Sequence, residues 1–200
     1  MGGQPLAKWR RFKRQAVTCA VMVLSLTLCL AFGHASYRYT TKNLTEVVPG
    51  ELYRSAQIDR DDLAAFKERY GIRSVLNLRG AQASKGWYQE EIAAAAELGL
   101  QHASFKMRAN KPLSDDEAEW LIALMARMPK PLLVHCRQGA DRTGLASALY
   151  LAAVKGMDPE AAEGQLSIYF GHVALPYLSE GWSMTETWER LELAMAAEAE

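Results

Sequence analysis

The chain has 200 residues, half of them apolar, which is enough for the buried core of about one domain. Lys and Arg balance Asp and Glu at 23 each, so the net charge is zero and general affinity for nucleic acid is not expected. The charges are distributed unevenly, because five basic residues lie close to the N-terminus and the first acidic residue is Glu46.

Residues 1–15 are a basic flank, and residues 16–35 begin with seventeen uncharged, mostly apolar residues. This length is at the short end of the ~17–25 residues that span a bilayer. A signal segment cleaved before Ser36 is the alternative to an uncleaved anchor. Tyr37 and Tyr39 suit the aromatic belt at a membrane surface. We therefore expect the basic flank to stay in the cytoplasm and the rest of the chain to lie outside it.

The three cysteines are Cys19, Cys29 and Cys136, and the first two lie in the apolar segment. Cys136 is thus the only thiol of the expected folded domain and has no partner there for a disulfide. In an oxidising compartment an unpaired cysteine is a liability unless its chemistry is used. The distribution of cysteines therefore favours a functional role for Cys136.

After the apolar segment we expect a polar linker over residues 36–49 and one domain over residues 50–200. The turn signal Pro49-Gly50 predicts a strand over residues 51–54, apolar residues predict strands over residues 72–78 and 131–134, and weak alternation predicts one over residues 100–105. Helical periodicity and end signals predict helices over residues 59–70, 87–98, 114–128 and 145–151, one starting at Asp158-Pro159, and one over residues 185–197. Alternating strands and helices predict an α/β fold with a central, mostly parallel sheet flanked by helices.

Residues 134–144 read Val-His-Cys-Arg-Gln-Gly-Ala-Asp-Arg-Thr-Gly and connect a predicted strand to a predicted helix. Unpaired backbone N–H groups and the positive end of the helix dipole make such a turn an anion site. Cys136 lies at its entry, where the thiolate form is favoured. Arg142 adds a planar fork of donors that fits phosphate oxygens, and Gly139 gives the loop backbone freedom. The segment therefore predicts a phosphate-binding loop with a reactive cysteine.

The HCxxGxxRT pattern of residues 135–143 resembles the phosphate loop of the cysteine-dependent protein tyrosine and dual-specificity phosphatases. A looser resemblance extends over residues 50–171, where residues 52–57 and 75–80 are similar to segments of bacterial dual-specificity-like phosphatases. Ala140 stands where many relatives carry a lysine, so the loop does not indicate a phosphoinositide preference. The resemblance implies a phosphatase catalytic domain with a dual-specificity phosphatase-like fold.

The implied activity is phosphomonoester hydrolysis through a phosphocysteine intermediate, without a metal or other cofactor. Cys136 would be the nucleophile, Arg142 would hold the phosphate, and the hydroxyl of Thr143 would hydrogen-bond the thiolate. His135 would orient the loop, although a core histidine is an equally good interpretation. Arg79 follows a strand end and would reach the pocket mouth, unless it is only solvated. The residues expected to bind substrate are Arg137, Gln138, Gly139, Ala140, His135 and Arg79.

The general acid has two candidates, Asp141 and Asp115. Asp141 lies inside the loop, where a bound dianion favours its protonated form. Asp115 follows the connection in which tyrosine phosphatases usually carry the acid, but the helix dipole also favours acids in a first turn. We prefer Asp141, with Asp115 as the second candidate.

Two alternative functions share the same sequence features: a rhodanese-like sulfurtransferase and a non-catalytic phosphate-binding module. Gly139 together with Arg142-Thr143 favours the phosphatase. The expected partner is a phosphorylated protein or another phosphomonoester, such as a lipid or sugar phosphate, and no nucleic acid. The expected location is the bacterial inner membrane, crossed once, or export if the signal is cleaved.

Overall fold

Within residues 4–198, which the computed structural model describes, a five-stranded sheet lies at the centre of the domain, in the order β1-β2-β5-β3-β4. β1 runs antiparallel to β2, and the remaining neighbours run parallel. The strands are β1 (Thr45–Val48), β2 (Leu52–Ser55), β3 (Ser74–Asn77), β4 (Gln101–Ser104) and β5 (Leu132–His135). The predicted α/β fold with a mostly parallel sheet is confirmed.

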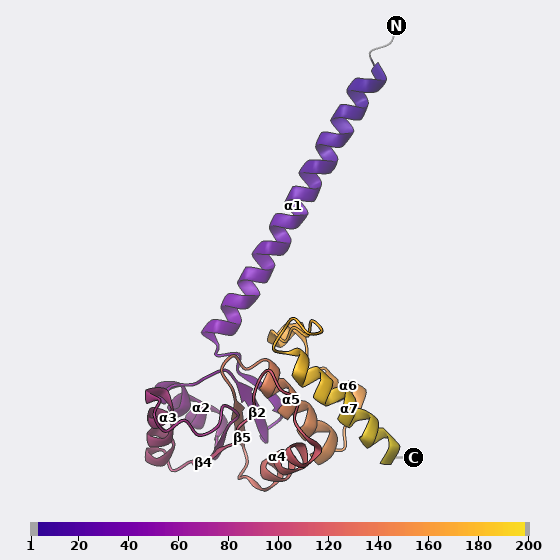
Figure 1. Cartoon of the computed structure of the whole chain (residues 1–200). Coiled ribbons are helices and arrows are strands. Elements are labelled where there is room, and N and C mark those ends of the chain that lie inside the picture. The colour runs from indigo at the N-terminus through magenta and orange to yellow at the C-terminus, as the bar shows by residue number, and fades with distance from the viewer. Residues whose placement is uncertain (1–3, 199–200) are drawn as a thin grey trace. The chain divides into compact units, whose positions relative to one another are not determined.

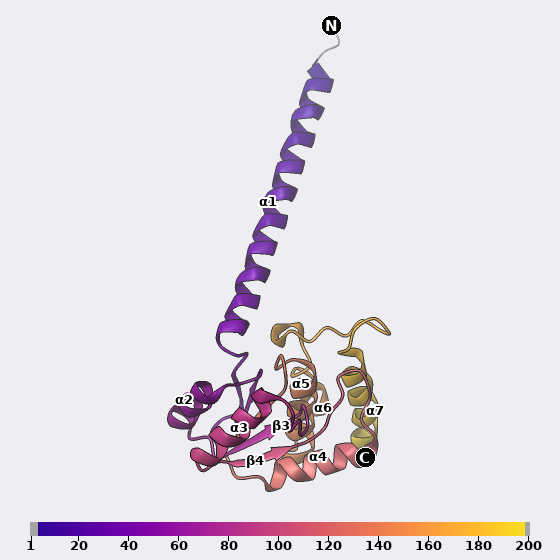
Figure 2. The same cartoon turned by 60° about the vertical axis from the view of Figure 1, so that its left-hand side comes forward.

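Helices cover both faces of the sheet (Figure 1). On one face are α2 (Arg60–Tyr70) and α3 (Gly86–Glu97), and on the other are α4 (Asp115–Arg127), α5 (Asp141–Leu149) and α7 (Trp182–Glu198). A π-helical turn (Tyr150–Val154), α6 (Pro159–Glu163) and a 3-10 turn (Ile168–Phe170) follow α5. The stretch between that 3-10 turn and α7 is irregular and runs over the surface of the domain (Figure 2).

The central strand β5 determines where the phosphate loop lies. Leu133 packs into the core on the α2–α3 side, whereas Leu132 and Val134 pack into the core on the α4–α5 side. Side chains of a strand alternate between faces, and a central parallel strand is covered on both, so all four residues of β5 are buried. Its carboxyl end delivers Cys136 to the edge of the sheet, where α/β folds bind ligands.

Local signals set the ends of the helices. Asp59 caps α2 through the backbone N–H of Asp62, and Gly71 ends the helix in the left-handed conformation at φ 68°. Ser114 and Glu117 form the predicted capping box at the start of α4. These boundaries follow from neighbouring residues alone, so the sequence predicts them well.

The N-terminal unit, residues 1–40, is separate from the unit formed by residues 41–200. In it, α1 (Gln4–Thr40) is one continuous helix, and its part from Trp9 to Thr40 is long and apolar enough for a membrane span or a signal segment. The linker expected over residues 36–49 differs from the structure, because residues 36–40 continue α1 and β1 forms the edge of the sheet. Only one of the four β1 residues is exposed, but the strand lacks the alternation of polar and apolar residues that would predict it.

Candidate active site

The loop from Cys136 to Ala140 joins β5 to α5 and holds a buried cysteine at the start of the helix. The backbone N–H of Gly139 donates to the Cys136 sulfur at 3.2 Å. Ala140 is the cap of α5 and makes no side-chain hydrogen bond to the first-turn N–H groups of the helix. The sulfur therefore lies at the N-terminal end of a helix, where an anion such as phosphate would be stabilised.

Arg54 holds the outer side of the loop. Its side chain is completely buried, and Nη2 donates to the carbonyl oxygens of Gly139 at 2.9 Å and Ala140 at 3.1 Å. Nη1 donates to both the backbone and side-chain oxygens of Gln165 at 2.8 Å, and the guanidinium lies 3.9 Å from the centre of the Phe170 ring. Burial lowers the pKa of Arg54 to about 9, although the charges of Cys136 and Asp141 oppose that shift.

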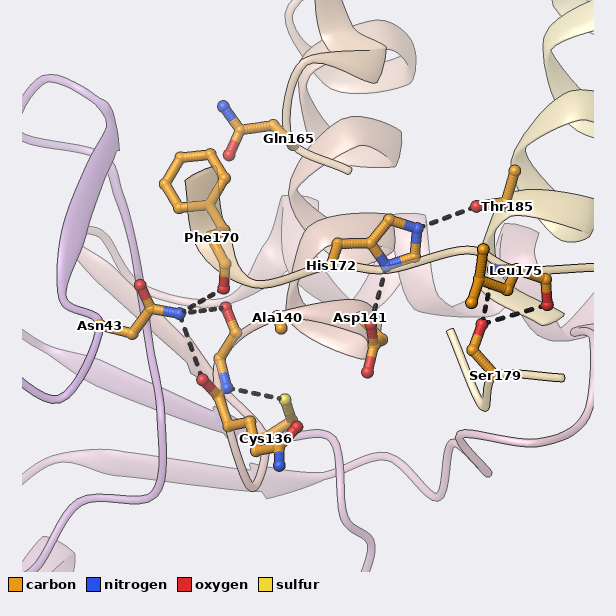
Figure 3. Close-up of polar contacts among 12 residues, drawn as sticks. Asn43, Cys136, Ala140, Asp141, Gln165, Phe170, His172, Leu175, Ser179 and Thr185 are labelled. Atoms are coloured by element: carbon orange, nitrogen blue, oxygen red, sulfur yellow. Dashed lines mark hydrogen bonds and ion pairs between the residues drawn. The ribbon is translucent and has the colours of Figure 1, made fainter. Parts of the chain in front are cut away.

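Asn43 supports the same loop from the start of the domain (Figure 3). Its Nδ2 donates to the carbonyl oxygens of Gln138 at 3.2 Å, Gly139 at 3.1 Å and Phe170 at 2.9 Å. In a trans peptide the C=O and the following N–H point in opposite directions. Because Arg54 and Asn43 hold these loop carbonyls outward, the N–H groups that follow them point inward. The Gly139 N–H that reaches the Cys136 sulfur is one of them.

Besides Arg54, the guanidinium groups of Arg79, Arg137 and Arg142 lie around the loop. Arg142 donates from Nη1 to the carbonyl oxygen of Met107 at 3.4 Å. Arg79 stacks on Trp87, with its guanidinium 3.5 Å from the ring centre. Burial lowers the pKa of Arg79, and the nearby positive charges of Arg142 and Arg137 lower it further. A bound anion reduces the repulsion between neighbouring positive charges, so this cluster of arginines suits a phosphate group.

Asp141, the preferred acid, is fixed by a residue that follows it by 31 positions (Figure 3). His172 Nδ1 lies 2.7 Å from Asp141 Oδ1, and His172 Nε2 lies 2.9 Å from the hydroxyl of Thr185 in α7. The His172 side chain is buried, whereas that of Asp141 is 20% exposed. A Cβ atom at Gly181 would lie 2.8 Å from Asp141 Oδ1, so a glycine leaves room for this pair.

Two other predicted residues have different surroundings from those expected. Asp115, the second candidate acid, forms an ion pair with Arg190, and its side chain is 69% exposed. The Thr143 hydroxyl is buried and has no hydrogen-bond partner among the described residues, so the expected bond to the thiolate is not made. The backbone N–H of Gly139 occupies that role at the sulfur instead.

His135 lies behind the loop in a buried polar network. Its Nε2 is 3.1 Å from Glu91 Oε1, which also lies 2.8 Å from Nε2 of His102. Gln57 donates to the other oxygen of Glu91 at 2.7 Å and accepts from Arg79 at 2.6 Å. Burial by itself raises the pKa of Glu91, but the hydrogen bonds from His102 and His135 outweigh it and lower the pKa to about 2. The network therefore connects the base of the loop to the arginine at its mouth.

Several of these residues carry no signal in the sequence. Asn43, Glu91, Gln165 and His172 are single polar residues whose partners lie far away along the chain. Arg54 is different, because a charged residue inside a short strand whose four residues are all buried is unusual. In the part of the chain that the structure describes, no group of three or more His, Cys, Asp or Glu side chains could hold a metal ion.

A cysteine at the end of a central strand, an arginine in the first turn of the next helix and inward N–H groups between them define the fold and loop of a cysteine-based phosphatase. The model of the tyrosine phosphatase family matches residues 34–163, so the chain belongs to that family. A comparison with curated proteins gave no match.

Solved structures agree on the fold. TpbA of P. aeruginosa, solved in complex with phosphotyrosine, is 23% identical with a TM-score of 0.56, over 78% of this chain and 91% of that one. PTPMT1 in complex with PI(5)P is 14% identical with a TM-score of 0.56, and the match covers 78% of this chain and 99% of that one. A putative phosphatase of Shewanella putrefaciens is 19% identical with a TM-score of 0.56, and the match covers 78% of this chain and 93% of that one. Likeness at this level of identity establishes the fold alone.

Proposed function

We propose that the chain hydrolyses phosphomonoesters through a phosphocysteine intermediate, as a protein tyrosine or dual-specificity phosphatase. One observation carries the proposal: the Cys136 sulfur accepts an N–H at the start of α5, inside a loop whose carbonyls Arg54 and Asn43 hold outward. Membership of the tyrosine phosphatase family supports the same chemistry.

The reaction has two displacements at phosphorus. The thiolate of Cys136 forms a sulfur–phosphorus bond while the ester P–O bond breaks, and the leaving oxygen takes a proton from the acid. Water then attacks the phosphocysteine, gives its proton to the same carboxylate, and releases inorganic phosphate and the thiolate. The guanidinium of Arg142 and the inward N–H groups hold the three equatorial oxygens and stabilise their charge in both transition states.

Asp141 is the acid in this mechanism. Its hydrogen bond to His172 uses Oδ1, which leaves Oδ2 for the leaving oxygen and later for water. Asp115 is less suited, because Arg190 neutralises it and most of its side chain faces solvent. His172 acts here as a positioning residue, since it touches the acid rather than the substrate.

The two alternative functions are less well supported. A rhodanese-like sulfurtransferase would not need the arginine of the first helical turn, and the family match lies with the phosphatases. A non-catalytic module would not need a cysteine at hydrogen-bond distance from the loop N–H. Formation of thiocyanate from thiosulfate and cyanide, in place of phosphate release, would identify the sulfurtransferase.

We also propose that α1 anchors the protein in the bacterial inner membrane and that the catalytic domain lies outside the cytoplasm. The apolar part of α1 supports the anchor by its length and composition. The basic residues that precede it support the orientation.

The mechanism is tested with the full chain in detergent. It should hydrolyse para-nitrophenyl phosphate in the presence of EDTA, and Cys136→Ser should lower kcat by at least about 10³-fold while the fold persists. The matched control is Cys19→Ser with Cys29→Ser, which changes two thiols of α1 and should leave kcat unchanged. Full activity of Cys136→Ser would exclude the proposed intermediate.

A further inference from the structure

An exposed apolar segment precedes α7. Residues 164–179 contain no Asp, Glu, Lys or Arg. Within them, Tyr177 is 94% exposed, Leu178 85% and Ile168 79%, and the other exposed apolar side chains are Tyr169, Val173 and Leu175. Single exposed apolar residues are common on soluble domains, but a contiguous run without charge is typical of a surface that binds something.

The apolar segment is attached to the active site. The Phe170 carbonyl oxygen accepts the same Asn43 Nδ2 that holds the phosphate loop, and the Phe170 ring lies against the guanidinium of Arg54. Two residues later His172 holds Asp141 (Figure 3). Whatever binds the apolar segment is therefore close to the mouth of the phosphate loop.

The apolar segment is also attached to the point where the chain leaves α1. Asn43 follows the last residue of α1 by three positions, a length of chain that spans at most about 11 Å. The Lys42 carbonyl oxygen accepts the N–H of Ala56 at 2.6 Å, and Lys42 Nζ lies 2.9 Å from Asp62 Oδ2. Lys42 and Asn43, near the start of the second unit, are thus held by the domain itself, and Asn43 contacts Phe170 there.

The dimensions of α1 place that exit near the surface of a bilayer. Its apolar stretch over residues 16–32 is about 26 Å long as a helix, close to the ~30 Å hydrocarbon core. Tyr37 and Tyr39 follow this run and suit the headgroup level, where such side chains gather. Asn43, four residues after Tyr39, cannot be far from that level.

We propose that residues 164–179 form a second membrane contact, which inserts its exposed apolar side chains into the headgroup–acyl boundary of the bilayer that α1 crosses. The proposal rests on the proposed anchoring by α1. An uncharged segment with tyrosine and leucine at its tip matches the composition of interfacial segments. This contact keeps the phosphate loop at the bilayer, so that the loop acts on phosphomonoesters held at the membrane surface.

The test uses two exposed leucines of the full chain. Leu178 lies in the apolar segment, and Leu193, 73% exposed, lies in α7 about 16 Å beyond the start of that helix. Leu178→Cys and Leu193→Cys are each made in a chain that carries Cys19→Ser, Cys29→Ser and Cys136→Ser, labelled with an environment-sensitive dye, and placed in phospholipid nanodiscs. Because this background has no catalytic thiol, the result does not depend on the proposed mechanism.

The dye at position 178 should lose about half or more of its fluorescence to a nitroxide on the upper acyl chain, since interfacial side chains reach ~5–10 Å deep. The dye at position 193 should lose little. Equal and weak quenching at both positions would overturn the proposal. Disulfide-linked dimers of the unlabelled Leu178→Cys chain, with no quenching by lipid, would overturn it in favour of a contact between two copies.

Discussion

Asp141 and Asp115, the two candidates for the general acid, both start a helix, but their surroundings differ. The carboxylate of Asp141 is held by His172 within the phosphate loop, whereas that of Asp115 is paired with Arg190 at the surface. The helix dipole explains why an acid is favourable at either position, so it does not distinguish the two. The hydrogen bond to a buried histidine does distinguish them, because it fixes the carboxylate of Asp141 at the start of α5.

We expect Asp141→Asn to slow hydrolysis of phenyl phosphate by about 10²–10⁴-fold and that of para-nitrophenyl phosphate much less. Phenolate needs a proton from the acid to leave, whereas nitrophenolate leaves without one. Steady-state kinetics with the two substrates measures the difference, and Asp115→Asn serves as the matched control. A dependence on the leaving group in Asp115→Asn, absent from Asp141→Asn, would reverse the assignment.

Glu91 is the buried charge on which the base of the loop depends. Its folded pKa of about 2 lies below the ordinary value of 4.5, since hydrogen bonds from His102 and His135 outweigh burial. The stability that this shift provides is fully present above pH 4.5 and is lost as the pH falls toward 2. A pKa shift of this size corresponds to a contribution of about 3 kcal/mol to the free energy of unfolding.

Glu91→Gln should therefore make the free energy of unfolding fall less steeply between pH 5 and pH 2.5, while lowering stability at pH 7. Glu90→Gln changes the exposed neighbouring residue and should keep the pH dependence of the unaltered protein. Urea unfolding at a series of pH values measures both. If the free energy of unfolding changes with pH equally in Glu91→Gln and in the unaltered protein, Glu91 does not provide this stability.

The phosphate loop is shaped by the strand beside it. Gly139 has φ 69°, and a Cβ atom there would lie 2.6 Å from the backbone nitrogen of Ala56. The loop thus passes directly over the end of β2, where Arg54 donates hydrogen bonds to two carbonyl oxygens of the loop. Both the positive φ and the close approach require glycine.

Gly139→Ala is expected to lower kcat/KM by about 10²-fold, because the backbone contact displaces the loop by a sizeable fraction of an ångström. Gly99→Ala is the matched control, since Gly99 has φ 65° but nothing within 4 Å of its added Cβ. Gly99→Ala should lower the free energy of unfolding by about 1–2 kcal/mol through backbone strain and leave activity unchanged. Hydrolysis of para-nitrophenyl phosphate and thermal unfolding separate the two effects. Equal activity in both variants would argue against the close approach.

The two units of the chain differ in how they are stabilised. Both hydrophobic cores consist of residues that follow Thr41. A domain with its own cores folds without its anchor. The described part of α1 between Trp9 and Thr40 is instead exposed and suited to lipid.

Residues 41–200, produced without α1, should therefore unfold in a single cooperative transition and hydrolyse para-nitrophenyl phosphate with the kcat/KM of the full chain. Far-UV circular dichroism during heating measures the first and steady-state kinetics the second. Gradual unfolding without a transition would indicate that α1 supports the fold.

The sequence predicts elements well where the decisive residues are neighbours. Asp59, Gly71 and Ser114 set helix ends because caps act within a few residues, residues 72–78 are rich in β-branched and apolar residues, and residues 131–134 are a continuous apolar run. It does not predict β1, whose residues pair with β2 without an alternating pattern. It also predicts a linker over residues 36–49, since polar residues there conceal the edge strand.

For the site, the sequence by itself determined the loop, because Cys136, Gly139 and Arg142 lie within seven residues and their chemistry needs only a strand before them and a helix after them. Only the tertiary structure decided what holds that loop in place. Asn43, Arg54, Glu91 and His172 reach it across 31 to 96 residues of chain, and such contacts arise from the order of strands in the sheet. The physical reason is range: caps, dipoles and periodicity act between neighbours, whereas a buried hydrogen bond depends on which distant segments the core brings together.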